Sequence, residues 1–432
     1  MPLPMDFWMV LRWLAIIALV VFVARRRSLT AWILVSMAVG AEVGHDFENV
    51  AVQLRFLSQI FLRLITTIVA PLLFATLVVG IAGHSNLRQV GRMGVRALIY
   101  FEVVTTFALL IGWVAISISR AGEGIVLPPP ADGTQILQTA PHTWQDTLIQ
   151  IFPQNIARAV ADAQMLQIVV FSVIFAIALA MIDEEKRRPL LSLAESLAET
   201  MFRFTRIVML FAPIGVGAAI AYTVGSLGVG ILVNLAKLLA TFYVAVAVFV
   251  VGVLFPVALL AKVPLKRFIA AVAEPVSIAF ATTSSEAALP RAMQAMERIG
   301  VPRQIVAFVM PTGYTFNLDG STLYLSLTSI FVAQAAGIHL TIGQQFVMLL
   351  TLMLSSKGVA GVPRGAVVVL LATISTFKLP VEPVLVILGI DAVLDMLRTS
   401  VNVLGNCLAT VVIARWEGEY RETPEPVPQA IQ

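Results

Sequence analysis

Long apolar runs separated by short polar or basic stretches recur along the whole chain. Runs of this length and composition predict α-helices that cross a lipid bilayer. The first run, residues 7–24, ends at the basic cluster Arg25-Arg26-Arg27, which the positive-inside rule places in the cytoplasm. The other helices are expected at about 29–44, 53–81, 97–118, within 144–182, and at 190–224, 231–260, 304–335 and 381–414. The pattern therefore predicts an all-α, multi-pass protein of the inner or plasma membrane.

Two further segments, 268–290 and 341–376, do not fit a simple crossing. The first has basic residues on both flanks, whereas both flanks of the second are poor in charge. Each should therefore begin and end on one side of the membrane, as a re-entrant hairpin. Each middle carries two adjacent serines and a later proline, in Ser284-Ser285…Pro290 and Ser355-Ser356…Pro363. Matched hairpins entering from opposite faces form an inverted repeat, which is typical of secondary transporters, although small residues can also serve only close helix packing.

The last apolar run carries a stripe of polar side chains. Five positions step by 4, 3, 4 and 4 residues, within an arc of about 80° on a helix: Asp391, Asp395, Arg398, Asn402 and Asn406. An ionisable side chain costs about 2.5–3.5 kcal/mol at the centre of a spanning helix. The simple interpretation is an Asp–Arg–Asp ion pair that holds helices together. Two acids, one base and two amides exceed what such a pair needs, so we expect a polar site for a charged solute.

A second polar string, Thr315-Phe-Asn-Leu-Asp-Gly-Ser321, interrupts the run 304–335. Asn, Asp and Gly together weaken a helix, so the string predicts an unwound turn. Exposed backbone carbonyls and the side-chain oxygens of Asn317 and Asp319 would then form a cage for a bare cation. If sodium is the coupled ion, these two residues are the candidate metal ligands.

Composition narrows the classes of function. Hydrophobic residues make up 59% of the 432 and charged residues 12%, as expected for a membrane protein. The net charge of +4 comes without a basic patch interleaved with aromatics, so no nucleic-acid partner is expected. One cysteine and four scattered histidines predict neither a disulfide framework nor a transition-metal site, and no cofactor beyond the coupled ion is expected. No histidine base lies in the late membrane segments to activate a serine, which argues against an intramembrane enzyme.

At these strings the sequence resembles the dicarboxylate/amino acid:cation symporter family, which includes the glutamate transporters. The resemblance runs from about 29 to 416 and is strongest from 278 to 415. It implies a homotrimer whose protomers each contain a trimerisation scaffold and a transport domain that moves as an elevator, with hairpin 341–376 as the outer gate. The implied division is an extra helix and basic turn at 1–28, scaffold at 29–96 and 144–230, a transport-domain helix at 97–118, an outer loop at 119–143, transport domain at 231–414, and a cytoplasmic tail at 415–432.

The resemblance also implies roles for single residues. In the family, the position of Arg398 holds the side-chain carboxylate of the substrate, and that of Asp395 holds its amino group. The other expected substrate-site residues are Thr399, Asn402, Ser284, Ser285, Thr315 and Gly361. The expected cation-binding or proton-carrying residues are Asn317, Asp319, Asp391, Asn406 and Glu102.

These roles agree with side-chain chemistry, because a guanidinium pairs with a carboxylate through two parallel hydrogen bonds and a carboxylate suits an ammonium group. Arg398 therefore favours an acidic substrate, and Asp395 favours an amino acid such as glutamate or aspartate. A C4-dicarboxylate symporter on the same fold differs only in needing no partner for an amino group, and stays the first alternative. An anion channel is a weaker one.

Three departures from the family pattern bear on the coupled ion. Asn406 stands where sodium-coupled members commonly have a carboxylate ligand, and Phe101 and Val104 stand where archaeal members have hydroxyl groups. Glu102 lies at membrane depth, where desolvation favours a protonated carboxyl, although it can equally be a hydrogen-bonded structural group. We therefore expect proton coupling over sodium coupling, through Glu102 or Asp319. Some cation must accompany the anion, because an inside-negative potential opposes its entry by about 2.3 kcal/mol per charge per 100 mV.

Overall fold

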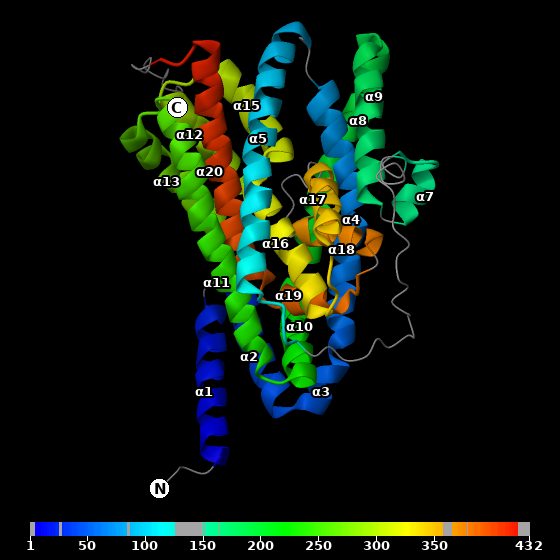
Figure 1. Ribbon diagram of the computed structural model, residues 1–432, viewed down its shortest axis with the longest axis vertical. Coiled ribbons are helices and arrows are strands. Elements are labelled where there is room, and N and C mark those ends of the chain that lie inside the picture. The colour runs from blue at the N-terminus through cyan, green and yellow to red at the C-terminus, as the bar shows by residue number, and fades with distance from the viewer. Residues whose placement is uncertain are drawn as a thin grey trace.

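The computed structural model describes residues 5–25, 28–83, 87–125, 149, 152–162, 164–356, 365–377 and 379–421. Over these residues the chain forms α-helices and one short π-helix and contains no strand, which confirms the all-α prediction. Figure 1 shows long helices that run close to one axis, with α1 (Met5–Ala24) at one end and the C-terminal end of α20 (Asp391–Glu417) at the other.

One group of helices is built around α10. Its members contact one another: α2 (Leu29–Asp46), α3 (Glu48–Gln53), α4 (Arg55–Ala82), α7 (Ile156–Ala161), α8 (Met165–Met181), α9 (Glu184–Met209) and α10 (Ala212–Leu227). Glycines allow α2 and α10 to approach closely, because a Cβ atom on Gly40 would lie 2.3 Å from the carbonyl oxygen of Gly217. This group covers most of the stretches expected to form the scaffold, but residues 87–96 of that expectation lie in α5 (Leu87–Ser119) of the second group. The division into domains stays a prediction.

A second group surrounds α16. It contains α5 (Leu87–Ser119), α11 (Ile231–Phe249), the π-helix Val250–Leu254, α12 (Phe255–Leu260), α13 (Leu265–Thr282), α14 (Ser285–Arg298), α15 (Arg303–Phe316), α16 (Asp319–Ala335), α17 (Ile342–Ser355), α18 (Gly365–Thr376), α19 (Glu382–Leu388) and α20. Almost every residue of α16 is buried, and α16 contacts α5, α11, α17, α18 and α20. It is also buried at its polar first turn, so the polar strings of the sequence meet in the interior.

Two breaks lie within this second group. Asn317 and Leu318 leave the helical conformation between α15 and α16, which confirms the predicted unwound turn, but Asp319 already belongs to the first turn of α16. The expected continuous helix 381–414 is wrong, because Gly389 and Ile390 separate α19 from α20. A Cβ atom on Gly389 would lie 2.3 Å from the Cδ1 atom of Ile220 in α10, so glycine permits close contact with the first group here.

The segment 268–290 forms two packed helices, α13 and α14, with a turn at Thr283 and Ser284. The second arm does not end at Pro290 as expected but continues to Arg298. In the segment 341–376, α17 and α18 also pack together, and residues 357–364 between them lie outside the described residues. The paired helices agree with the predicted hairpins, while their re-entrant course through a membrane stays a prediction.

Two other expected bounds need correction. The helix expected at about 97–118 begins earlier, at Leu87, so that Arg88, Arg92 and Arg96 lie within α5, because hydropathy locates only the apolar span and arginine remains a good helix former beyond it. The expected helix 190–224 is instead the pair α9 and α10, bent by 51°. Pro213 in the first turn of α10 has no backbone N–H, so it cannot donate the hydrogen bond that would continue the helix from α9.

Among the described residues, five helices are long and apolar enough to cross a membrane: Phe7–Ala24, Glu48–Ala82, Met93–Ser119, Ile231–Leu260 and Asp391–Glu417. The bent pair of α9 and α10 adds a sixth if it forms one span. These helices agree with a multi-pass membrane protein.

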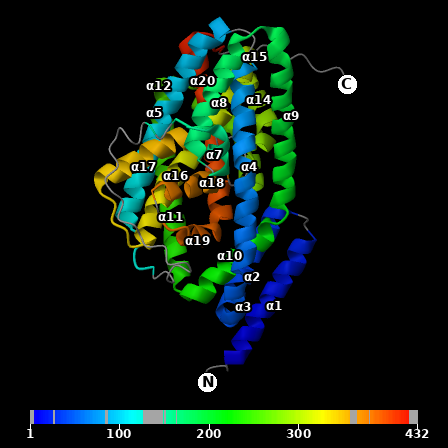
Figure 2. The ribbon, with the colours of Figure 1, turned by 90° about the vertical axis from the view of Figure 1, so that its right-hand side faces the viewer.

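Helix α1 is held to the end of α2 by charged and polar contacts. The guanidinium of Arg12 pairs with Glu42 at 2.9 Å and with Asp46 at 2.7 Å, and the Trp13 indole donates to Asp46 at 2.8 Å. Figure 2 shows α1 beside α2 at the end remote from the C-terminal end of α20. Most apolar side chains of α1 are exposed in the protomer, as expected for a peripheral helix facing lipid.

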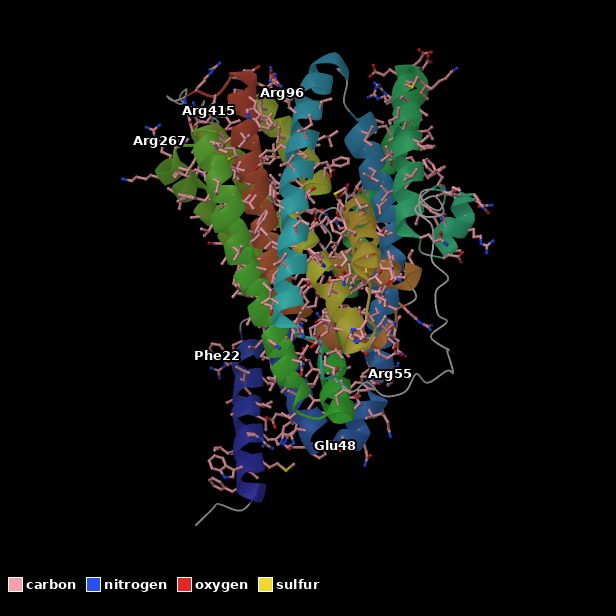
Figure 3. All side chains as sticks on the ribbon, viewed as in Figure 1. Phe22, Glu48, Arg55, Arg96, Arg267 and Arg415 are labelled. Carbon is pink, nitrogen blue, oxygen red and sulfur yellow. The ribbon has the colours of Figure 1, made fainter. Side chains whose placement is uncertain are left out.

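The C-terminal end of α20 is hydrogen-bonded to other parts of the second group, as is the segment that follows it. Arg96 of α5 donates to the Trp416 carbonyl at 2.6 Å, and the Arg421 backbone donates to the Gly300 carbonyl at 3.0 Å. Figure 3 shows Arg96, Arg267 and Arg415 together at this end of the molecule. A basic end agrees with the cytoplasmic side predicted for it.

Candidate functional site

The polar stripe predicted on the last helix lies in the interior. Asp391, Asp395, Arg398, Asn402 and Asn406 are all buried on α20. The helix presents this face to the first turn of α16 and to the neighbouring helices of the second group. The stripe contributes to two polar clusters, which we call the Arg398 cluster and the Asp319 cluster.

The Arg398 cluster contains a buried cation between two carboxylates. The Arg398 Nε atom donates to Asp395 Oδ1 at 3.0 Å, and Nη2 donates to the same oxygen. Its Nη1 atom lies 3.6 Å from Asp391 Oδ1. The guanidinium also lies over the Tyr324 ring, 4.4 Å from the ring centre. Two anions and an aromatic face thus compensate the burial of the charge.

Tyr324 contacts one carboxylate, that of Asp391, and the guanidinium of Arg398. Its hydroxyl donates to Asp391 Oδ1 at 2.9 Å, and the residue is fully buried on α16. Asp391 therefore contacts both the hydroxyl and the guanidinium that lies over the same ring. Sequence reasoning missed Tyr324, although its place one turn after Gly320 puts it on the same helix face.

Asp395 is engaged within the protein. Its Oδ1 atom accepts from Thr399 Oγ1 at 3.2 Å as well as from Arg398. The two groups expected to bind the opposite charges of a zwitterionic substrate thus pair with each other. A ligand carboxylate and ammonium group could replace this pair, one on each partner, without leaving either charge uncompensated.

Asn402 joins α20 to the start of α16. Its side-chain oxygen accepts from the backbone N–H of Gly320 at 2.8 Å and of Ser321 at 3.3 Å, and its Nδ2 atom donates to Ser321 Oγ at 3.0 Å. Gly320 permits this approach, because a Cβ atom there would lie 2.4 Å from the Arg398 carbonyl oxygen. In this conformation Asn402 satisfies the first N–H groups of α16.

The Asp319 cluster lies at the break between α15 and α16. Asp319 accepts from Asn317 Nδ2 at 3.2 Å and from Thr105 Oγ1 at 3.4 Å. Asn317 Nδ2 also donates to Asn406 Oδ1 at 3.1 Å. Gly405 makes room for the carboxylate, because a Cβ atom there would lie 2.3 Å from Asp319 Oδ2. The structure thus brings three predicted residues together and adds Thr105, which the sequence reasoning did not include.

Two amide atoms of this cluster are poorly satisfied. Asn317 Oδ1 and Asn406 Nδ2 are buried and have no hydrogen-bond partner within the described parts of the chain. Oxygens of one carboxylate, two amides and one hydroxyl suit a small hard cation. Phe101 and Val104 are also buried beside Thr105 on α5, and neither supplies a ligand atom. The donor set therefore contains a single carboxylate.

The tip of the first hairpin, residues 283–285, carries the predicted serines. Thr283 has a φ of +52°, and the Ser284 hydroxyl caps α14 by accepting from the Ala287 N–H at 3.3 Å. Ser285 is buried. The Thr30 hydroxyl of α2 donates to the Ala281 carbonyl at 3.2 Å, so the first group touches this hairpin just before its tip.

The remaining expected residues are less central. Glu102 is half-buried, and its neighbours Val103 and Phe107 are exposed, so it lies at the margin of the buried face of α5. Gly361 and the side chain of Thr315 lie outside the described parts of the chain.

Comparison with known proteins identifies relatives over most of the chain. Residues 29–416 match the model of the sodium:dicarboxylate symporter family. The chain is 42% identical over 404 residues to a proton/sodium-glutamate symport protein of Bacillus caldotenax, covering 91% of this chain and 95% of the relative. It is 42% identical over 370 residues to the proton/glutamate-aspartate symporter of Escherichia coli (strain K12), covering 84% and 85%. A C4-dicarboxylate transport protein of Anaeromyxobacter sp. (strain K) is 39% identical over 399 residues, covering 91% and 90%.

Proposed function

The chain belongs to the sodium:dicarboxylate symporter family, and from this premise we propose that it imports glutamate or aspartate together with protons. Membership in the family and the apolar helices make it a multi-pass membrane transport protein of the cation-coupled symporter class. The substrate and the coupled ion within that class are the proposal.

The pairing of Arg398 with Asp395 carries the substrate assignment. Both side chains are buried, and each is the counter-charge of the other in this conformation. On binding, the guanidinium would take the side-chain carboxylate of the amino acid, and Asp395 would take its ammonium group. The buried Ser285 and the N–H groups at the start of α14 would face the main-chain carboxylate. Asn402, Thr399, Thr315 and Gly361 would complete the expected site.

The Asp319 cluster supports proton coupling. Its single carboxylate, the amide of Asn406 and the apolar side chains of Phe101 and Val104 give a poorer set of sodium ligands than a site with two carboxylates. Relatives named for proton coupling, with or without sodium, are as similar to the chain as any reported above.

A C4-dicarboxylate is the second candidate substrate, because one relative of 39% identity is named for this transport. A dicarboxylate would still pair with Arg398, but it would offer no cation to Asp395. Release of Asp395 from Arg398 would then leave a buried carboxylate without a counter-charge, which is costly. The geometry therefore favours an amino acid.

The two groups of helices support an elevator mechanism within a homotrimer. They meet at a limited set of contacts that includes Arg55 with Glu382, Ile220 with Gly389, and Thr30 with Ala281. The α10-centred group would remain fixed, while the α16-centred group would carry both polar clusters across the inner membrane.

Uptake by reconstituted proteoliposomes tests the proposal. Labelled glutamate, aspartate and succinate would be offered at clamped membrane potential, with either an inward proton gradient or an inward sodium gradient. Concentrative uptake of the two amino acids under the proton gradient alone is the expected result. A strict need for sodium would contradict proton coupling, and succinate uptake as efficient as that of aspartate would contradict the substrate assignment.

A further inference from the structure

The chain turns back on itself directly after α20. Gly418 has a φ of +74°, a conformation that glycine adopts without the steric cost of a Cβ atom. The Glu419 N–H donates to the Ala414 carbonyl at 3.0 Å, so the turn satisfies a carbonyl group at the end of the helix. The turn directs residues 418–421, which we call the C-terminal strap, onto the neighbouring turns of the second group.

The C-terminal strap contacts the turn that follows the first hairpin, between α14 and α15. The Tyr420 hydroxyl donates to the Ile299 carbonyl at 2.8 Å, and the Arg421 N–H donates to the Gly300 carbonyl at 3.0 Å. Gly300 has a φ of +106°, and a Cβ atom on it would collide with the Arg421 carbonyl oxygen. Glycine at this position therefore allows the strap to lie directly against the end of the hairpin.

The same region contacts the turn that precedes the first hairpin, between α12 and α13. Arg415, in the last turn of α20, donates from Nη2 to the Lys262 carbonyl at 3.1 Å. Lys262 has a φ of +51°, which is uncommon for a residue other than glycine. The Arg415 guanidinium also lies 4.1 Å from the centre of the Tyr420 ring. Arg415 and Tyr420 thus connect the two ends of the hairpin to each other and to α20.

The position of this hairpin on α20 bears on the proposed substrate site. Both α13 and α14 pack against α20, and the Ser400 hydroxyl of α20 lies 3.5 Å from the Val276 carbonyl of α13. The hairpin carries Ser285, whereas α20 carries Arg398. These two residues are proposed to bind opposite ends of the substrate, so the distance between them depends on how the hairpin is held against α20.

We propose that the C-terminal strap positions the first hairpin on α20 and thereby determines the length of the acidic substrate that fits between Ser285 and Arg398. The assignment rests on the proposed function and deepens it. Arg415 and Tyr420 are positioning residues, because they contact the ends of the hairpin and not the proposed substrate site. Aspartate and glutamate differ by one methylene group, so a hairpin held at one distance favours one of them, and a hairpin that can shift discriminates less.

The Tyr420→Ala variant removes both the hydrogen bond to Ile299 and the ring beside Arg415. In proteoliposomes, KM would be measured for labelled aspartate and for labelled glutamate. We expect the ratio of the two KM values to move towards one by about threefold or more. Tyr420→Phe keeps the ring and should stay close to the unaltered protein. A smaller amount of folded protein would lower the maximal rate for both substrates and leave the ratio unchanged.

The Gly300→Ala variant displaces the strap without altering it, because the added Cβ atom collides with the Arg421 carbonyl. Gly230→Ala is the matched control, since a Cβ atom there meets nothing within 4 Å. Hydrogen–deuterium exchange would be measured for the backbone amides of α14. Exchange should be about tenfold faster in Gly300→Ala and Tyr420→Ala than in the unaltered protein, because the end of the hairpin is then released. The KM ratio should move in Gly300→Ala and stay constant in the control.

Each result decides for or against the strap. A constant KM ratio in both Tyr420→Ala and Gly300→Ala would overturn the proposal, as would unchanged amide exchange of α14 in both variants. Equal KM values of the unaltered protein for aspartate and glutamate would overturn it as well. If the unaltered protein takes up C4-dicarboxylates and neither amino acid, the proposed function fails by itself. The ratio is then read from succinate and glutarate, which also differ by one methylene group, and the role of the strap is judged by the same criteria.

Discussion

The guanidinium carbon of Arg398 lies 4.4 Å from the centre of the Tyr324 ring, and the hydroxyl of the same tyrosine donates to Asp391. One side chain of α16 thus contacts the guanidinium that is proposed to bind the substrate, and it also donates to a carboxylate that pairs with this guanidinium. Since these contacts do not involve Asp395, they can hold Arg398 in place when Asp395 turns to a ligand.

We expect replacement of Tyr324 to weaken substrate binding in two steps. Tyr324→Phe keeps the ring and loses the hydrogen bond to Asp391, whereas Tyr324→Leu also loses the aromatic face. A desolvated cation–π contact contributes about 2 kcal/mol, so KM for glutamate should rise roughly tenfold or more in the leucine variant and less in the phenylalanine variant. Kinetics of uptake at several substrate concentrations would measure this. Equal KM values for all three proteins would contradict the supporting role.

Asp395 is predicted to discriminate amino acids from dicarboxylates. Asp395→Asn removes the charge for the ammonium group while keeping the shape of the side chain, so uptake of aspartate should fall about 10- to 100-fold relative to succinate. Thr399→Val, which removes one hydrogen bond to Asp395, serves as the milder variant. The measurement is competition between labelled aspartate and unlabelled succinate. A selectivity ratio that stays constant in Asp395→Asn would exclude the assigned role.

Asn406 is predicted to weaken the response to sodium. Asn406→Asp adds a second carboxylate to the Asp319 cluster beside Asn317, which favours a hard monovalent cation. Uptake at fixed pH should then become stimulated by sodium, by several-fold at about 100 mM. Asn406→Ala removes the amide without adding a charge and should show no such stimulation. Uptake would be measured over a series of sodium concentrations, with choline as the replacement cation. Uptake by Asn406→Asp that does not rise with sodium would contradict the prediction.

The ion pair between Arg55 and Glu382 is predicted to influence the movement of the two helix groups. The Arg55 Nη2 atom lies 3.5 Å from Glu382 Oε1, and its guanidinium lies 5.2 Å from the centre of the Tyr222 ring. Both charged side chains are partly exposed, so the pair contributes about 0.2–1 kcal/mol. Glu382→Arg should change the rate of uptake by up to about fivefold without changing KM. The double variant Arg55→Glu with Glu382→Arg restores opposite charges and should recover part of the rate. A double variant as impaired as Glu382→Arg alone would argue against a direct interaction.

Much of the architecture follows from hydropathy, because spans and polar stripes are local features of the sequence. The stripe from Asp391 to Asn406 and the break at Asn317 were both readable in this way. The interruption at Gly389 was not, because it depends on contact with Ile220 of a distant helix. The bend between α9 and α10 was missed for another reason, since apolar residues continue through it.

Within the candidate site, the sequence revealed side chains whose charge is unusual in a membrane. It did not reveal Tyr324 or Thr105, because a tyrosine or threonine in an apolar helix is unremarkable until its partner is known. It also could not show that Arg398 and Asp395 engage each other, since their spacing is equally compatible with separate partners. Glu102 stood out for its carboxyl group, but its position at the margin of α5 depends on how that helix is rotated.

The charges of the two buried clusters determine how the affinity for an acidic amino acid depends on the concentration of the coupled cation. Together they contain three carboxyl groups, those of Asp319, Asp391 and Asp395, and one guanidinium, that of Arg398. If all four of these groups are ionised, the negative charges in the interior outnumber the positive charge. An incoming acidic amino acid would then add one more negative charge. Binding of the anion and binding of a cation must then strengthen each other to the same extent. The apparent dissociation constant for glutamate should therefore fall as the concentration of the coupled cation rises, and glutamate should raise the affinity for that cation by the same factor.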